Sequence, residues 1–237
     1  RPDGTALAGH VSPPVPGVDF STGSLGHGLS LGCGVALGLK RDGKPGRAFV
    51  ILSDGECDEG SIWEAVLFAP HHGLDNLVAI VDVNRLGQRG APMHGWNSDV
   101  FRDRAEAFGW SAIQIDGHDV SQIDRAYRDA LADDRPTLIV ARTQKGHGVS
   151  FLADQENWHG KAVPADRLGE AIVELGGDRG VRCTPPSPPE LHLTAVARET
   201  GAARPTYDGP IATRKAFGET LAWLAATYDD VVVLDGE

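Results

Sequence analysis

Short apolar runs alternate along the chain with longer segments whose apolar residues recur at helical spacing. Each run has the length of a buried strand. Strands are predicted at Ala48–Leu52, Leu77–Val83, Ser111–Asp116 and Thr137–Ala141. Helices are predicted at Gly26–Lys40, Glu59–His72, Val100–Phe108 and Val120–Ala132, the last capped by Asp119 or Ser121. This alternation indicates an α/β fold in which a parallel sheet is flanked by helices.

A change of pattern near residue 176 predicts a domain boundary. From Gly176 to Pro210 the regular spacing disappears, and the run Thr184-Pro185-Pro186-Ser187-Pro188-Pro189 suits an extended connector. Beyond it, Ala212–Thr227 indicates a helix and Val231–Leu234 a buried strand. We therefore expect a first domain over residues 1–175, a Pro-rich linker over 176–210 and the incomplete start of a second α/β domain over 211–237.

Charge and composition narrow the function classes. The chain has 22 Lys and Arg against 33 Asp and Glu residues, a formal net charge of −11, and no basic block, which argues against a nucleic-acid partner. Its longest apolar stretches are about five residues, far below the roughly 20 that a membrane-spanning helix needs. The cysteines, Cys33, Cys57 and Cys183, form no C-x-x-C pair and predict neither a disulfide framework nor a zinc site. This usage fits a reducing, cytoplasmic setting.

Two candidate oxygen ligands follow neighbouring strands. Asp54 and Gly55 come after the first predicted strand, and Asn84 follows the second. Ligands bind at the carboxyl ends of strands in open α/β sheets. One carboxylate and one amide carbonyl are typical of Mg²⁺, which completes its shell with water and phosphate oxygens. The loop Ser21–Gly26 opens a helix whose amino end can receive a diphosphate, and Gly55 permits close backbone approach. The alternative is an ordinary Asp-Gly turn, which spacing alone does not exclude.

Several segments resemble transketolase. Asp54-Gly55-Glu56, thirty residues before Asn84, is similar to the thiamine diphosphate motif. Segments similar to transketolase in particular are Ser21–Gly26, Asp54–Ala65, Leu74–Leu77, Asn84–Gln88, Asn157–Lys161 and Ile211–Ala216. Trp158–Gly160 and Ala212–Lys215 distinguish the chain from pyruvate dehydrogenase and deoxyxylulose phosphate synthase. The resemblance spans nearly the whole chain and implies a diphosphate-binding domain, an interdomain linker and the start of a pyrimidine-binding domain.

The resemblance implies a cofactor and metal site. Asp54, Asn84 and the Leu86 carbonyl would bind Mg²⁺, with Ca²⁺ or Mn²⁺ as substitutes. The residues that would bind thiamine diphosphate are Gly23, Ser24, Leu25, Asp54, Gly55, Glu59, Asn84, Lys145 and His159. Lys145 would lie near the diphosphate, although as a bare residue it would be a solvated surface lysine. Glu59 resembles a glutamate that links the two active sites of a homodimer, and its alternative is a helix-start carboxylate.

The resemblance also implies catalytic and substrate contacts. His10 and His159 match substrate-facing positions, where imidazoles bind sugar hydroxyls and exchange protons. Arg214 matches an arginine that binds the sugar phosphate, and its alternative is a helix-surface charge. His27 falls where relatives often carry Gln, so a hydrogen-bonding role in the site and a purely structural role both remain open.

The implied activity is the reversible transfer of a two-carbon ketol group in the pentose phosphate pathway. The donor would be a ketose phosphate, such as xylulose 5-phosphate or sedoheptulose 7-phosphate, and the acceptor an aldose phosphate, such as ribose 5-phosphate or erythrose 4-phosphate. The glutamate that the family uses to contact the aminopyrimidine ring is expected beyond Glu237. The chain starts at Arg1 and its single methionine is Met93, so the native start is expected to be missing.

These features predict a fragment of a longer, homodimeric transketolase that is inactive alone. Two alternatives remain. One is a partner-dependent subunit of a split transketolase, and the other is a non-catalytic module that binds thiamine diphosphate.

Overall fold

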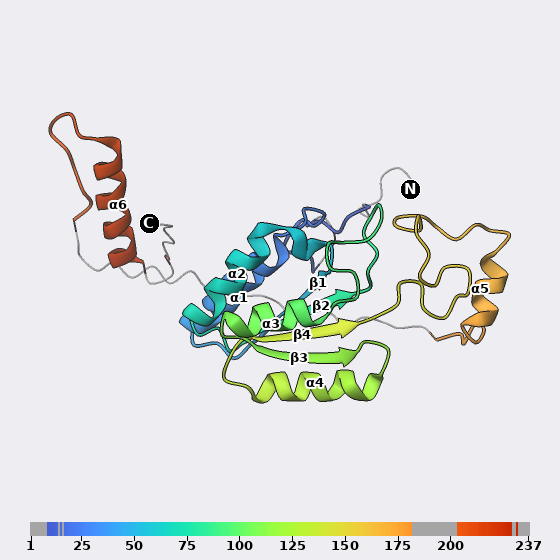
Figure 1. Cartoon of the computed structure of the whole chain (residues 1–237). Coiled ribbons are helices and arrows are strands. Elements are labelled where there is room, and N and C mark those ends of the chain that lie inside the picture. The colour runs from blue at the N-terminus through green and yellow to red at the C-terminus, as the bar shows by residue number, and fades with distance from the viewer. Residues whose placement is uncertain (1–8, 14, 16, 182–202, 229–230, 232–237) are drawn as a thin grey trace. The chain divides into compact units, whose positions relative to one another are not determined.

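The computed structural model describes residues 9–13, 15, 17–181, 203–228 and 231 of the chain (Figure 1). The chain divides into two compact units, Arg1–Thr184 and Pro185–Glu237. The first unit contains the sheet and the helices α1 to α5, and the second contains α6. Most of the predicted linker, residues 176–210, lies outside the described residues, so the expected division into two domains stays a prediction.

A four-stranded parallel sheet in the order β1-β2-β4-β3 forms the centre of the first unit. The strands are β1 (Ala48–Ser53), β2 (Leu77–Val83), β3 (Ser111–Asp116) and β4 (Thr137–Arg142). The register pairs Ser53 with Asp82 and Val83 with Arg142, so the carboxyl ends of the strands lie at one edge. The four strands predicted for the first domain are present, and the predicted fold class, a parallel sheet flanked by helices, is confirmed.

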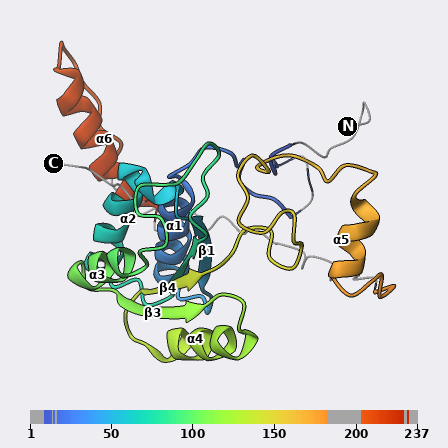
Figure 2. The same ribbon diagram turned by 45° about the vertical axis from the view of Figure 1, so that its right-hand side comes forward.

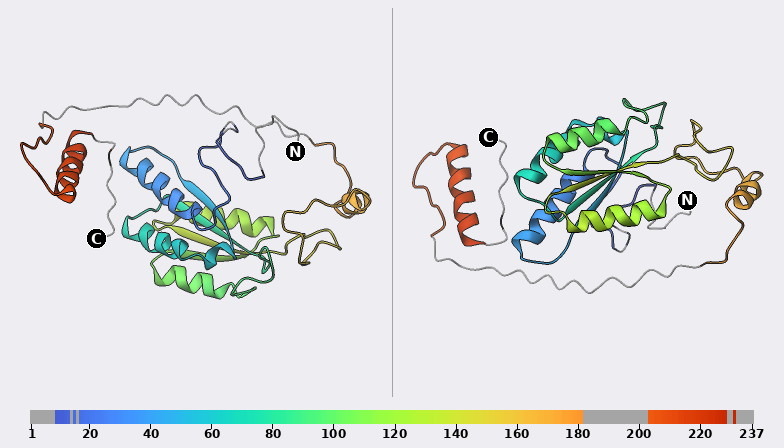
Figure 3. Two further views of the ribbon diagram at one scale, coloured as in Figure 1. Left: turned by 90° about the horizontal axis from the view of Figure 1, so that it is seen from above. Right: turned by 60° about the horizontal axis from the view of Figure 1, so that its bottom comes forward.

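Helices lie on both faces of the sheet (Figures 2 and 3). They pack there because the apolar side chains of a strand point alternately to each face. One face, with Leu52, Val81 and Val140, packs against the helices α1 (Gly28–Arg41), α2 (Gly60–His71) and α3 (Asp99–Ala107). The other face, with Val78 and Ile139, packs against α4 (Val120–Ala132). The apolar core lies between the sheet and these helices. Polar side chains can therefore occupy the loops at the carboxyl ends of the strands.

The helix boundaries differ from the predictions for local reasons. Helix α1 begins at Gly28 rather than Gly26, because Gly26 has a φ of 85°, outside the helical region. Helix α2 begins at Gly60, with Glu59 extended before it. Helix α3 is shifted by one residue from its predicted range. At α4 the Asp119 side chain accepts the backbone N–H groups of residues 121 and 122, so Asp119 is the cap.

Two short elements escaped sequence analysis. The 3₁₀ helix η1 (Glu56–Asp58) is too short to show a periodicity. The helix α5 (Leu168–Glu174) has largely exposed apolar side chains, including Leu168 and Val173, and therefore lacks a clear buried stripe.

The second unit contains α6 (Thr213–Thr227), which agrees with the predicted helix to within one residue. Before it, the Tyr207 hydroxyl donates to the Ala216 carbonyl at 3.4 Å. Except for Val231, the predicted strand Val231–Leu234 lies outside the described residues. No helix in the described parts of the chain combines the length and apolar character needed to cross a membrane.

Candidate functional site

Asp54 is a buried carboxylate at the carboxyl end of β1, with 1% of its surface exposed. Its backbone N–H donates to the Asp82 carbonyl at 3.1 Å, which continues the β1–β2 pairing by one residue. Its Oδ1 accepts the Gly55 amide at 2.9 Å, and its Oδ2 accepts the Arg85 amide at 2.6 Å. The side chain is thus held between the loops that follow two adjacent strands.

The electrostatic environment of Asp54 favours a bound cation. Burial raises the pKa of the Asp54 carboxyl, and the nearby Asp82 charge acts in the same direction. The amides that donate to Asp54 lower this pKa and offset part of the effect. Among the described residues Asp54 has no ion-pair partner, so its buried charge is solvated by amide N–H groups alone. A buried carboxylate of this kind gains most from a metal ion.

Asn84 and Leu86 flank Arg85, whose amide donates to Asp54. Asn84 is 7% exposed, and its Oδ1 accepts the Leu86 amide at 3.1 Å. Between them, Arg85 has a φ of 61°, which turns the loop so that its amide reaches Asp54. No group of three or more His, Cys, Asp or Glu side chains that could hold a metal occurs in the described structure. A cation held by the predicted ligands Asp54, Asn84 and the Leu86 carbonyl would have one carboxylate and two neutral oxygens, a set that fits Mg²⁺.

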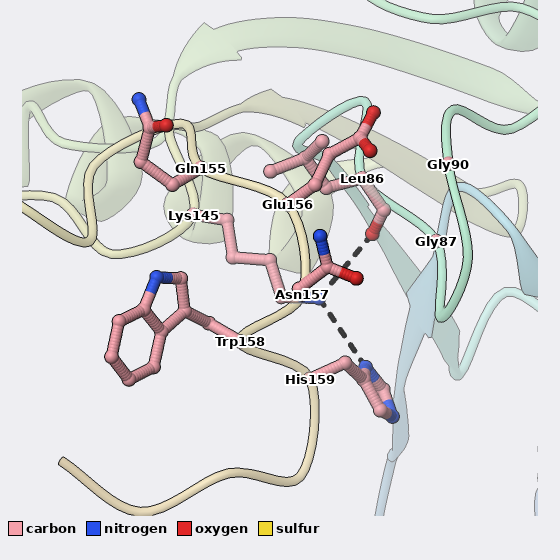
Figure 4. A pocket seen from close by; sticks show the side chains of 9 residues that line it. All are labelled: Leu86, Gly87, Gly90, Lys145, Gln155, Glu156, Asn157, Trp158 and His159. Carbon is pink, nitrogen blue, oxygen red and sulfur yellow. Dashed lines mark hydrogen bonds between the residues drawn. The ribbon is translucent and has the colours of Figure 1, made fainter. Parts of the chain in front are cut away.

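Lys145 and His159 join this loop from the segment after β4. The Lys145 Nζ donates to the Leu86 carbonyl at 3.3 Å and lies 3.3 Å from His159 Nδ1 (Figure 4). A small pocket surrounds these groups, and its lining residues are Leu86, Gly87, Gly90, Lys145, Gln155, Glu156, Asn157, Trp158 and His159. The lining includes the Lys145 ammonium group and the Glu156 carboxylate, and the ammonium group offers N–H donors to an anion. The Leu86 carbonyl, a predicted metal ligand, thus already accepts a hydrogen bond from the Lys145 ammonium group. Its second lone pair is left for a cation.

The loop that precedes α1 is tied to the chain after β1. The buried Gly26 donates its amide to Glu56 Oε1 at 2.9 Å, and its carbonyl accepts the Ser61 hydroxyl at 2.9 Å. Glu56 and Ser61 are not among the predicted site residues, although both lie in the segment Asp54–Ala65 that resembles transketolase. They hold the exposed residues Gly23, Ser24 and Leu25 near the start of α2.

His10 lies against this same loop. A Cβ atom at Gly23, whose φ is 111°, would lie 2.9 Å from His10 Cγ, so the imidazole packs on the bare glycine backbone. Two hydrogen bonds from Thr22 to the Val11 carbonyl, at 2.9 and 3.0 Å, hold the two chain segments of this contact together. The structure therefore places a predicted catalytic histidine beside a predicted cofactor-binding glycine.

The remaining predicted site residues have simpler surroundings. Glu59 is exposed and directly precedes α2. A Cβ atom added at Gly26 would lie 3.0 Å from the Cβ of Glu59, so Glu59 borders the loop 21–26. Gly55 has an ordinary φ of −69° and precedes η1, so its conformation does not demand glycine. His27 occupies the N-cap position of α1 without a side-chain cap bond. Arg214 belongs to α6 in the second unit and is not placed relative to the other site residues.

The two described cysteines take no part in the site. Burial raises the pKa of the Cys33 thiol to about 11 and that of the Cys57 thiol to about 12. Both thiols are therefore neutral at physiological pH and pack as small apolar groups.

Comparison with known proteins identifies the family. A family model described as "Transketolase, thiamine diphosphate binding domain" matches residues 3–182. Transketolase-like protein 2 of Bos taurus is 43% identical to this chain over 242 residues, and transketolase of Homo sapiens is 40% identical over 238 residues. Each alignment covers 98% of this chain but 38% of the relative, so the chain spans a little over a third of their length.

Solved structures show the same fold. The transketolase of Campylobacter jejuni has a TM-score of 0.62 and 28% identity, covering 70% of this chain and 27% of that chain. The transketolase of Pichia stipitis in complex with sedoheptulose 7-phosphate has a TM-score of 0.62 and 26% identity, covering 73% of this chain and 27% of that chain.

Proposed function

The chain belongs to the transketolase family, and from this premise we propose that it binds thiamine diphosphate with Mg²⁺ for ketol transfer between sugar phosphates. A ketose phosphate is the donor and an aldose phosphate the acceptor. The observation that carries the proposal is the buried Asp54 carboxylate, which lies beside Asn84 and has only amide partners among the described residues. Since the relatives are much longer, ketol transfer is proposed for a complete protein that contains this chain, and binding for the chain itself.

Asp54, Asn84 and the Leu86 carbonyl are the proposed ligands of the cation. Oxygen donors suit a hard divalent ion, and the remaining coordination positions are left for water and diphosphate oxygens. The exposed loop residues Gly23, Ser24 and Leu25, with Gly55, border the diphosphate. Lys145 adds a positive charge beside the Leu86 carbonyl, which favours the anionic end of the cofactor.

Substrate handling is proposed for the histidines and the arginine. Thiamine diphosphate, when bound, supplies the nucleophilic carbon that takes up the two-carbon group. His10 and His159 hold the sugar hydroxyls and exchange protons with them, since imidazole does both near neutral pH. Arg214, whose planar guanidinium matches a phosphate group, binds the far end of the sugar phosphate.

The assembly proposed for the complete protein is a cytoplasmic homodimer acting in the pentose phosphate pathway. Its support is the resemblance of the Glu59 segment to the one that links the two active sites of a transketolase dimer. The exposure of Glu59 beside the loop 21–26 is compatible with such a contact.

Calorimetric titration of thiamine diphosphate into the chain, with Mg²⁺ and with EDTA, tests the metal and cofactor site. We expect binding that requires Mg²⁺. Asp54→Asn removes the buried charge with little change of shape and should weaken binding at least about tenfold, or about 1.4 kcal/mol. The matched control is Asp129→Asn, which removes an exposed carboxylate on α4.

Equal affinity with and without Mg²⁺, or unchanged affinity in Asp54→Asn, would contradict the metal assignment. A chain that shows folded circular dichroism but no binding would contradict the proposal for the chain itself. Ketol transfer from xylulose 5-phosphate to ribose 5-phosphate is then assayed with a complete protein that contains the chain. Binding without turnover there indicates a non-catalytic module.

A further inference from the structure

An ion pair joins two loops that each carry candidate site residues. The Arg85 guanidinium donates from Nε to Asp154 Oδ1 at 2.8 Å and from Nη2 to Asp154 Oδ2 at 2.5 Å. Arg85 lies between Asn84 and Leu86 in the loop after β2, and Asp154 lies in the segment 145–159 after β4. Two parallel N–H···O bonds fix both the distance and the relative orientation of the two groups. The pair therefore constrains how the two loops approach each other.

The backbone of each partner contacts its own part of the site. The Arg85 amide donates to Asp54 Oδ2 at 2.6 Å, and the Asp154 amide donates to the Lys145 carbonyl at 2.8 Å. Both residues adopt a left-handed backbone conformation, with φ values of 61° and 57°. Residues other than glycine hold this conformation where the surrounding structure imposes it. A continuous series of hydrogen bonds thus runs from the carboxylate after β1 to the lysine after β4.

The arginine is also held from a further direction. Its guanidinium carbon lies 4.8 Å from the centre of the Trp96 ring, and the indole Nε1 donates to the Thr143 carbonyl at 3.3 Å. Arg142 stacks on the same ring at 5.1 Å. A guanidinium that stacks on a tryptophan and forms two carboxylate bonds has little freedom to move. These contacts hold the Arg85 side chain in one position and distinguish it from a mobile surface charge.

We propose that the Arg85–Asp154 pair is a positioning device that couples the metal-binding loop to the segment carrying Lys145 and His159. The inference rests on the proposed function, since it concerns the same cofactor site. Neither side chain of the pair needs to touch the cofactor or the reacting atoms. The pair acts through Leu86, whose carbonyl lies 3.3 Å from Lys145 Nζ, and so sets the separation of this proposed cation ligand and the ammonium group.

Binding measurements on a double-mutant cycle test the coupling. In Asp154→Asn and in Arg85→Gln we expect the affinity for thiamine diphosphate with Mg²⁺ to fall about tenfold, as is typical when a supporting group of a metal site is removed. If the residues act as one unit, the double variant should bind within about threefold of either single variant. Multiplied losses in the double variant would overturn the proposal.

A second readout needs no cofactor. The imidazole signals of His159 in the ligand-free chain, assigned from the spectrum of His159→Gln, report the contact with Lys145. Lys145→Met gives the reference position for a lost contact. We expect Asp154→Asn to move the His159 signals toward this reference, because the lysine is no longer held against Leu86. A role limited to overall stability would leave them in place.

The matched control is Asp124→Asn, which breaks an Arg–Asp pair of the same chemistry, Arg128–Asp124, within α4. It should change neither the affinity nor the His159 signals. If Asp154→Asn does not fold, Arg85→Lys keeps the charge without the fork and is expected to give the same losses. Unmoved His159 signals in the folded variant overturn the inference. If the wild-type chain binds no thiamine diphosphate, the proposed function fails, while the His159 signals still decide the positioning role.

Discussion

Gly26 connects the loop before α1 to the chain after β1 with both of its backbone polar groups. A side chain there has no room, because a Cβ atom would lie 2.4 Å from the Ser61 hydroxyl, and its φ of 85° disfavours any other residue. The hydrogen bonds of Gly26 position the exposed residues 23–25 just before it, which are proposed to border the diphosphate. At the residue scale, a single position without a side chain thus holds part of the site.

We expect Gly26→Ala to lower the free energy of unfolding by about 2–4 kcal/mol, because it adds a steric clash to the cost of a left-handed alanine. Urea unfolding measures this loss. The matched control is Gly43→Ala, whose φ is 61° but where a Cβ atom meets nothing within 4 Å, so only the backbone cost of about 1–2 kcal/mol applies. Equal losses in the two variants would show that the contact with Ser61 is not constraining.

At the scale of an element, helix α4 depends on the side chain that caps its amino end. The sequence is compatible with either Asp119 or Ser121 as the cap, and the structure decides between them. Asp119 Oδ1 accepts the amides of Ser121 and Gln122 at 2.9 and 3.2 Å. Its Oδ2 accepts the Gln122 side-chain amide at 2.9 Å, and these bonds, led by that of the Gln122 side chain, lower the pKa of the Asp119 carboxyl.

Asp119→Ala should lower the Tm by about 2–4 °C at pH 7 through loss of the cap. Because the folded-state pKa is depressed, this difference from the wild type is present above about pH 4, the ordinary value of an unfolded Asp. It should disappear as the pH falls through the lower folded-state value. Ser121→Ala is the control, and a loss as large as that of Asp119→Ala would mean that the hydroxyl and not the carboxylate caps the helix.

At the scale of the whole molecule, helices cover one face of the sheet less completely than the other. Phe49 and Ile51 of β1 point to the face that carries α4, yet they are 51% and 75% exposed. Neighbouring apolar side chains that the described helices leave exposed form a hydrophobic patch. This face is therefore expected to bind apolar dyes.

We expect the chain to increase the fluorescence of anilinonaphthalene sulfonate and Ile51→Thr to reduce this increase by about half, because threonine keeps the strand preference while adding a hydroxyl. The control is Val120→Thr, which changes a residue of similar exposure, 77%, at the start of α4. Equal decreases in both variants would show that the dye does not recognise the β1 face.

Much of the fold and part of the site could be predicted from the sequence. The strands were found because buried runs of about six residues are local signals, and the helices because their apolar residues recur at 3.6-residue spacing. That Asp54 and Asn84 lie at the same edge of the sheet could be predicted from the sequence, since the carboxyl ends of adjacent parallel strands share one edge. The resemblance to transketolase then assigned roles to these residues that their chemistry alone left open.

Contacts between distant segments could not be predicted. Gly26 and Glu56 are 30 residues apart, Leu86 and Lys145 are 59 apart, and Arg85 and Asp154 are 69 apart. Local patterns specify which residues are buried or helical, but the partner of a polar side chain depends on where packed elements bring the loops. The sequence by itself therefore determined the layered α/β fold and the proposed ligand chemistry at the strand ends. Only the tertiary structure decided which loops hold that chemistry in place.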